Sequence, residues 1–458
     1  MIFHRQPRPA PAAPPAPAPR KPPAATTPIP GPAAPAVPSI RPAGLPIRLL
    51  MGVFIVVIYS RLIEILPVRP LAPVGFALLL YGLVTSRWMD WIRTTPTLLL
   101  LGLTALMVPS ALAGDWPGGS VALLANVWSR SLLYFVIVVT IGRGLAGVGS
   151  VMASLAWSIG AVVVMGLTEA GAVGGRLSVG EVSLSNPNEL AATLVLALPF
   201  CGWYVLGSGR TLFLRVPMAG LTAWALFMLL RTGSRMGLLA LLGVAAVVLY
   251  ISRGRLRVLL LGVTLALGLA AVFFLPKTIQ QRFETIVESD PENPDDSAET
   301  ARAVGSTEAR WALIKNSLKI TAEHPLLGVG PGNVTTENAG LTKREGARAS
   351  WQVTHNSYTQ ISSECGIPAV CFFVGLLVYC LRSTNRLRKT MAAHPELRAH
   401  APIAFWLFVG LVGYVCVAAF GSFAYGFQLP LLAGMVVALE AATADALARP
   451  AAPPASTR

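Results

Sequence analysis

Long apolar windows recur along the chain and limit what it can fold into. Hydrophobic residues form 54% of the 458-residue sequence and charged residues only 12%, whereas a soluble domain carries about a quarter charged residues. About twelve windows are long enough to cross a hydrocarbon core of roughly 30 Å. The sequence therefore predicts an all-α polytopic membrane protein with spans near 47–66, 70–86, 96–113, 121–142, 148–168, 188–207, 212–230, 235–251, 256–275, 357–381, 403–422 and 427–447.

Basic residues in the short connecting segments predict the orientation. Arg87, Arg143, Arg253 and Arg382 each follow an even-numbered span, whereas the segments after the third and eleventh spans contain neither Lys nor Arg. The positive-inside rule then places both termini in the cytosol and the long segment after the ninth span outside. This distribution also accounts for the net charge of +15. The sequence lacks a basic face interleaved with aromatic residues, the pattern that would indicate a nucleic-acid partner.

The chain divides into five parts by composition. The first part is about one-third proline, which favours a disordered or polyproline-like tail over a packed domain. The predicted parts are a Pro/Ala-rich cytosolic tail (1–46), spans one to nine (47–275), an outer loop (276–354), spans ten to twelve (355–447) and a short cytosolic tail (448–458).

The outer loop has an internal pattern of its own. Its acidic, turn-rich run at 288–300 predicts a flexible linker, and residues 306–325 show the apolar spacing of an amphipathic helix that ends at Pro325. The glycine-rich stretch 326–333 predicts a turn, and 335–353 is interpreted as a loop. The acidic run lacks the spacing of a calcium-binding loop.

Arginines at the outer ends of the spans run against the usual inward bias of basic residues. Arg176, Arg235 and Arg310 occur in three separate outer segments, and converging arginines suit the binding of a phosphate-bearing lipid headgroup. Arg235 follows "TGS", which predicts a tight turn and a helix N-terminus where an anion binds readily. The alternative is that Arg176 is a solvated charge and Arg235 extends to the membrane interface.

Other polar groups within the spans are interpreted as structural. Arg61 and Glu64 are spaced to pair across one helical turn, and Arg130 lies inside the fourth span. The five cysteines are scattered without metal-ligand spacing and are interpreted as small apolar residues of the core.

His355 is the candidate for proton transfer. We expect it in the first turn of the helix that becomes span ten, with Thr354 as N-cap. A helix N-terminus disfavours the imidazolium ion, so the side chain is expected to be neutral and able to act as a general base. A hydrogen-bonded interfacial histidine without catalytic function is the equally open alternative.

Four motifs resemble one family. "HPLLGVGPGN" and "HNSYTQISSECGIPAVCFFVGLL" are similar to the signature region of the O-antigen ligase and polymerase superfamily, and "NPNELAATL" and "TGSRMGLLALL" are similar to its other two motifs. The resemblance extends over residues 47–447. The acidic insertion at 284–299 departs from the family pattern, and no soluble C-terminal domain of the kind found in some protein-glycosylating relatives follows the last span.

The resemblance implies a GT-C-like, inverting, metal-independent glycosyltransferase of the bacterial inner membrane, with its active site on the periplasmic face and without a cofactor. Its donor would be an undecaprenyl-diphosphate-linked glycan, and its acceptor a sugar hydroxyl, such as one of lipid A-core. The implied roles are the catalytic base for His355, diphosphate binding for Arg176, Arg235 and Arg310, and substrate positioning for Asn188, Asn356 and Tyr358.

The motifs leave the acceptor open. A lipid A-core acceptor would make the protein a ligase, a second lipid-linked repeat unit would make it a polymerase of O-antigen or exopolysaccharide, and a protein hydroxyl would make it a protein O-oligosaccharyltransferase. A polytopic transporter is the alternative from a different class, but the sequence lacks paired broken helices that meet at mid-membrane.

Overall fold

The computed structural model describes residues 43–64, 71–173, 175–180, 183–207, 209–252, 254–284, 298–344, 346 and 351–449. The predicted tails at 1–46 and 448–458 and the acidic insertion at 284–299 therefore lie almost wholly outside the described residues.

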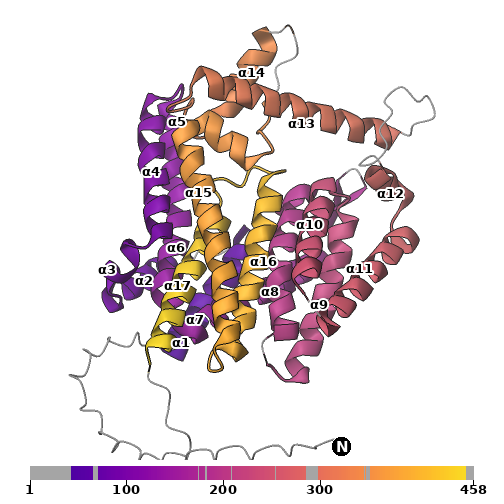
Figure 1. The fold of residues 1–458 in the computed structure, drawn as a ribbon. Helices are drawn as coiled ribbons and strands as arrows, with labels where there is room; N and C mark the ends of the chain where they lie inside the picture. Colours follow the sequence, from indigo (N-terminus) through magenta and orange to yellow (C-terminus); the bar gives the residue numbers. More distant parts are fainter. Residues whose placement is uncertain are drawn as a thin grey trace, which may run out of the picture. The chain divides into compact units, whose positions relative to one another are not determined.

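Membrane-length helices dominate the fold (Figure 1). Among the described residues, eight helices are long and apolar enough to cross a membrane. They are α4 (Thr95–Ala113), α5 (Pro117–Leu123) continuing through the π-helical η2 (Leu124–Trp128) into α6 (Ser129–Ile141), α7 (Gly144–Thr168), α8 (Pro187–Gly202) with η4 (Trp203–Gly207), α9 (Leu212–Arg231), α15 (Ser357–Ala393), η5 (Arg398–His400) with α16 (Ala401–Ala418), and α17 (Gln428–Ala448).

Four shorter apolar helices occupy the remaining predicted spans. They are α1 (Leu45–Tyr59), α2 (Leu71–Thr85), α10 (Arg235–Ile251) and the Arg257–Ala266 part of α11 (Arg255–Phe274). Each of the twelve predicted spans thus coincides with a helix, because apolar composition and helical length are local properties of the sequence. The helical, multi-pass class is confirmed, and the number of crossings stays a prediction.

The connecting segments contain shorter elements. They are η1 (Leu62–Glu64), α3 (Trp88–Ile92), β1 (Ala170–Val173), β2 (Arg176–Val179), η3 (Ser183–Ser185), α12 (Lys277–Glu284), α13 (Ala298–Glu323) and α14 (Val334–Arg344). The strands form an antiparallel hairpin in which Val173 pairs with Arg176, so the fold is not purely helical. Gly175, between the strands, has a φ of 73°, which favours a residue without a Cβ atom.

The loop after span nine is more helical than the sequence analysis predicts. A helix is present, but α13 begins at Ala298 and ends at Glu323, and it buries Leu313 and Ile320 while Trp311 and Leu318 are exposed. The interpretation of 335–353 as loop is wrong for its first half, where α14 packs Val334 and Leu341 against Val329 and Ile320. These apolar contacts come from tertiary structure, because the segment itself is polar.

A kink in α15 is the point where the outer loop is joined to the bundle. Gly366 interrupts the helix with a φ of 84° and a ψ of 173°. A Cβ atom on Gly366 would lie 2.3 Å from the carbonyl oxygen of Leu326, and one on Gly328 would lie 2.3 Å from the carbonyl carbon of Glu364. Only glycines permit this approach, so the turn after α13 is held directly against α15.

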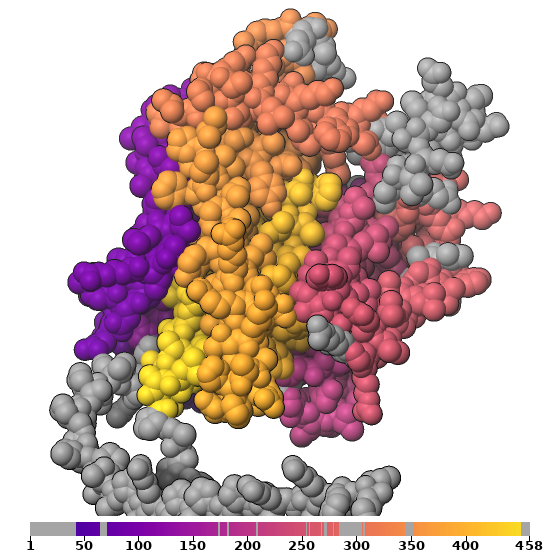
Figure 2. All heavy atoms as spheres, in the orientation of Figure 1, coloured from indigo at the N-terminus to yellow at the C-terminus, as the bar shows by residue number. Residues whose placement is uncertain are grey.

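Polar groups in the first part of α15 complete the junction. The carbonyls of Ser363 and Glu364 accept hydrogen bonds from the N–H groups of Val329 (3.0 Å) and Gly330 (2.9 Å). The buried Glu364 carboxyl also accepts a hydrogen bond from the hydroxyl of Tyr425, at 2.6 Å. The junction fixes α13 relative to the start of α15, and Figure 2 shows α13 covering this end of the helices.

Candidate active site

Arg176 joins two segments that lie far apart in the sequence. It begins β2, and its side chain is half-buried. Its Nε donates a hydrogen bond to the carbonyl of Thr232 (2.7 Å), and its Nη2 donates one to Oδ1 of Asn188 (2.9 Å). The guanidinium is thereby held between the start of α8 and the turn before α10.

Asn188 is the common partner of this part of the site. It lies in the first turn of α8, where Asn186 is the N-cap and accepts a hydrogen bond from the Asn188 N–H (2.9 Å). Asn188 Oδ1 accepts hydrogen bonds from Arg176 and from the hydroxyl of Ser234 (2.8 Å). Its observed contacts therefore position Arg176, and a direct contact with substrate stays a prediction.

The turn between α9 and α10 has the form that the sequence predicts. Gly233 adopts a φ of 56°, and Ser234 is the N-cap of α10, its hydroxyl accepting a hydrogen bond from the N–H of Gly237 at 3.2 Å. Arg235 is the first residue of the helix. A cation here adds to the positive end of the helix dipole, so this helix end favours a bound anion.

Arg282 belongs to the site but was missed by the sequence analysis. It projects from α12, and its Nε donates a hydrogen bond to the carbonyl of Gly233 at 3.4 Å. A Cβ atom on Gly233 would lie 3.6 Å from Cγ of Arg176 and 3.7 Å from Cδ of Arg282, so the two arginines flank this glycine. The available signal was the same as for the other three arginines, namely a cation in a segment predicted to face outside.

Arg310 brings α13 into the same electrostatic group. Burial, and then the positive charge of Arg282, lowers the pKa of Arg310. The charges of Arg282 and Arg310 also act on Arg235. We call Arg176, Arg235, Arg282 and Arg310 the arginine cluster. Its members repel one another, and this repulsion is relieved when an anion binds among them.

His355 does not lie where the sequence analysis expects it. The helix begins only at Ser357, and its N-cap is Asn356, whose Oδ1 accepts hydrogen bonds from the N–H groups of Tyr358 (2.9 Å) and Thr359 (3.0 Å). The prediction of Thr354 as N-cap and of His355 in the first turn is therefore wrong. Asn356 serves as the cap because its side-chain carbonyl reaches two of the unpaired N–H groups of this turn.

The backbone of His355 is held in an unusual conformation. Its φ is 52°, in the left-handed region that few non-glycine residues adopt. The His355 N–H donates a hydrogen bond to the hydroxyl of Ser422 (3.1 Å), and the hydroxyl of Ser357 donates one to the carbonyl of Gly421. The segment between α16 and α17 thus fixes the residue, as is common for strained residues at functional sites.

The predicted neutral state of His355 is supported for a different reason. Burial is the main factor that lowers the pKa of the imidazole, and the positive charge of Arg310 is the second. The same charge links the histidine to the arginine cluster, so the structure brings together His355, Arg176, Arg235 and Arg310 from four separate segments. A neutral imidazole at the edge of an anion-binding cluster can accept a proton.

Asn356 and Tyr358 pack α15 against α16. Nδ2 of Asn356 donates a hydrogen bond to the carbonyl of Ala419 (3.0 Å), and the hydroxyl of Tyr358 donates one to the carbonyl of Val415 (3.2 Å). Both side chains therefore have structural partners, and their role in substrate positioning stays a prediction. Within the described residues, no group of three or more His, Cys, Asp or Glu side chains is placed to hold a metal ion.

Part of the chain matches a known protein family. Residues 220–374 match the family model described as "O-Antigen ligase". The matched segment begins in α9, ends in α15 and includes Arg235, Arg282, Arg310 and His355. No curated protein matches the chain.

Proposed function

We propose that the chain, whose residues 220–374 match the O-antigen ligase family model, is an inverting, metal-independent glycosyltransferase of the bacterial inner membrane. It takes a glycan from an undecaprenyl-diphosphate donor and transfers it to an acceptor hydroxyl at the periplasmic face. The chain crosses the membrane twelve times in this proposal, with both termini in the cytosol. The observation that carries it is the convergence of the arginine cluster and His355 at one end of the bundle.

The arginine cluster binds the diphosphate. Forked guanidinium groups pair with phosphate oxygens through two hydrogen bonds, and they stabilise the negative charge that develops as the bond to the anomeric carbon breaks. Arg176 is already oriented by Thr232 and Asn188, so little reorganisation accompanies binding. The leaving undecaprenyl diphosphate departs with the electron pair of the broken C–O bond.

His355 activates the acceptor. Its neutral imidazole removes the proton from the acceptor hydroxyl while the oxygen forms a bond to the anomeric carbon, on the face opposite the leaving diphosphate. The proton ends on the imidazole, and the configuration inverts. A diphosphate bound to the cluster offsets the charge of Arg310, which otherwise disfavours the imidazolium. Donor binding thus strengthens the base when it is needed.

The test is reconstitution of the full chain with a lipid-linked glycan and an acceptor, with release of undecaprenyl diphosphate as the readout. His355→Ala is expected to lower the rate by about 10²- to 10⁴-fold, the usual contribution of a general base. His355→Asn is the matched variant, because asparagine tolerates the left-handed backbone but is not a base. It should fold and be equally slow.

His400→Ala is the control, since His400 is an exposed histidine of η5, outside the four motifs and the arginine cluster, and should retain activity. Wild-type rates in His355→Ala and His355→Asn would reject His355 as the base. No release by the wild type with lipid A-core, lipid-linked repeat or peptide acceptors would reject the transferase itself.

A further inference from the structure

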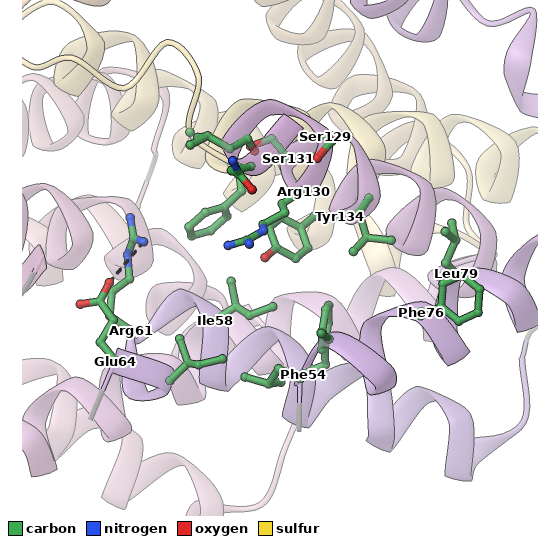
Figure 3. A pocket seen from close by; sticks show the side chains of 18 residues that line it. Phe54, Ile58, Arg61, Glu64, Phe76, Leu79, Ser129, Arg130, Ser131 and Tyr134 are labelled. Atoms are coloured by element: carbon green, nitrogen blue, oxygen red, sulfur yellow. Dashed lines mark hydrogen bonds and ion pairs between the residues drawn. The ribbon is translucent and has the colours of Figure 1, made fainter. Parts of the chain in front are cut away.

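A large cavity lies apart from the arginine cluster. It has a volume of about 1230 Å³ and is bounded by α1, η1, α2, the η2–α6 helix and the segment before α17. Figure 3 shows Ile58 and Phe54 of α1 facing Arg130 and Tyr134 of α6 across it. The volume exceeds the roughly 300–1,000 Å³ of ordinary small-molecule sites, and most lining side chains are apolar. These properties suit a lipid chain.

The cavity carries an excess of positive charge. Arg61 pairs with Glu64 at 3.6 Å, and the carboxylate of Glu64 also accepts hydrogen bonds from the hydroxyl (2.7 Å) and the N–H (3.0 Å) of Ser183. Arg130 lines the same cavity and is exposed. Among the described residues, no acidic side chain forms an ion pair with it. Among the lining side chains, two cations and one carboxylate leave one net positive charge, and the carboxyl of Glu189, outside the lining, lies within electrostatic range of Arg61 and Glu64.

An arginine in this position indicates a ligand. Arg130 lies near the middle of a helix that is long and apolar enough to span the membrane. A charge at such a depth is costly unless it meets an opposite charge or a polar cavity, and it therefore marks a functional site by default. The sequence favours a structural role for Arg130, but among the described residues its side chain has no ion pair or hydrogen bond, and its charge acts on the neighbouring Tyr134. A phosphate is the opposite charge that membrane lipids supply.

Two backbone irregularities occur at the cavity. The π-helical turn η2 ends directly before Ser129 and Arg130, and such turns are frequent at functional sites. Arg61 has a φ of 61° and is, with His355, one of two non-glycine residues with positive φ in the described chain. Arg61 thus has an irregular backbone itself, and Arg130 lies in α6 two residues after the π-helical turn.

The cavity shares supports with the active site. Gly426 and Phe427 line it, and the guanidinium of Arg61 lies 5.6 Å from the centre of the Phe427 ring. The same segment carries Ser422, which holds the backbone of His355. The segment between α16 and α17 thus contributes both to the cavity wall and to the support of His355.

We propose that the cavity binds the phosphate and adjoining chain of a long-chain lipid that carries the acceptor glycan. The proposal rests on the proposed transferase function and deepens it, since it makes the acceptor lipid-borne rather than a protein. The donor is not the occupant, because its diphosphate is bound by the arginine cluster on α10, α12, α13 and β2. Arg130 contacts the phosphate, Arg61 assists it, and the walls formed by α1 and α2 hold the chain.

Lipid binding to the purified full chain tests the site without any turnover. A long-chain polyprenyl monophosphate is titrated into the protein in zwitterionic nanodiscs, and bound lipid is counted by native mass spectrometry. The wild type should bind two molecules, one at each site. Arg130→Gln should weaken one binding event by about 10- to 100-fold, the effect of losing a charged hydrogen bond, and Arg235→Gln should weaken the other.

Two further variants separate charge from shape. Ile58→Trp should narrow the cavity opposite Arg130 and weaken the same binding event as Arg130→Gln. Arg382→Gln, at an exposed arginine of α15 outside the cavity, should change nothing. Unaltered binding in both Arg130→Gln and Ile58→Trp overturns the proposal. Displacement of the probe by equimolar phosphatidylglycerol also overturns it, because the occupant would then be an ordinary phospholipid.

A transfer assay connects the site to the acceptor. Arg130→Gln should raise KM for a lipid-linked acceptor by about 10-fold and leave KM for the donor unchanged. A raised donor KM would assign the cavity to the donor chain and overturn the proposal. If the wild type shows no transfer but the two binding events respond as described, the transferase function fails and the phosphate-lipid site stands.

Discussion

His355 and Arg61 share a left-handed backbone but lie in opposite electrostatic settings. His355 borders the arginine cluster, whose positive charges act on one another and on the imidazole. Arg61 lies in a cavity where a carboxylate already balances one of two cations. The cluster therefore suits a multiply charged, forked ligand such as a diphosphate, and the cavity suits a single phosphate with a long apolar chain. The difference supports the proposal that the two sites select their ligands by charge.

Replacing arginine by lysine at each site is the strongest way to test this difference. Arg235→Lys should lower the transfer rate by about 10²-fold or more, since an ammonium keeps the charge but not the fork that stabilises the leaving diphosphate. Arg130→Lys should change the rate by less than about threefold, because a point charge binds a single phosphate adequately. Initial rates in proteoliposomes provide the measurement. Full activity of Arg235→Lys would mean that Arg235 only extends to the membrane interface.

Arg282 tests whether the cluster extends to α12. Arg282→Ala should lower kcat/KM for the donor by about 10- to 100-fold, as expected for a charged hydrogen bond to phosphate, and leave KM for the acceptor lipid unchanged. Lys277→Ala is the matched control, because Lys277 is an exposed cation of the same helix. Equal activity of the two variants would show that Arg282 does not bind the donor. A changed KM for the acceptor would show that Arg282 also affects acceptor binding, contrary to the proposed separation of the two sites.

The smallest expected effect is a shift in pH dependence. The base must be neutral, so kcat/KM falls as the pH falls through the pKa of His355, which burial and Arg310 hold below its ordinary value. Arg310→Gln removes a positive charge that disfavours the imidazolium, so the pKa rises and the acid limb moves to higher pH. Arg130→Gln should leave the limb in place. A limb that moves to lower pH in Arg310→Gln would contradict the assignment of His355 as base.

Much of the fold was predictable because it depends on local composition. All twelve predicted spans coincide with helices, and the turn and helix start at Ser234 and Arg235 follow from the residues themselves. The predictions were wrong where contacts between residues far apart in the sequence determine the local structure. The helix α14 forms from a polar segment because Val334 and Leu341 find apolar partners on α13 and in the following turn. The cap of α15 is Asn356 and not Thr354, since the segment before α17 holds His355 outside the helix.

The sequence by itself determined the membrane class, the positions of the helices and the identities of His355, Arg176, Arg235 and Arg310 as candidates, because apolar length and misplaced cations are visible one segment at a time. Only the tertiary structure decided which charges meet. Arg282 joins the site because Gly233 leaves room for it beside Arg176. Gly328 and Gly366 allow the turn after α13 to lie directly against α15. Arg310 on α13 is thereby close enough to His355 for its charge to lower the pKa of the imidazole. Such approaches depend on packing between segments far apart in the chain, and no local pattern encodes them.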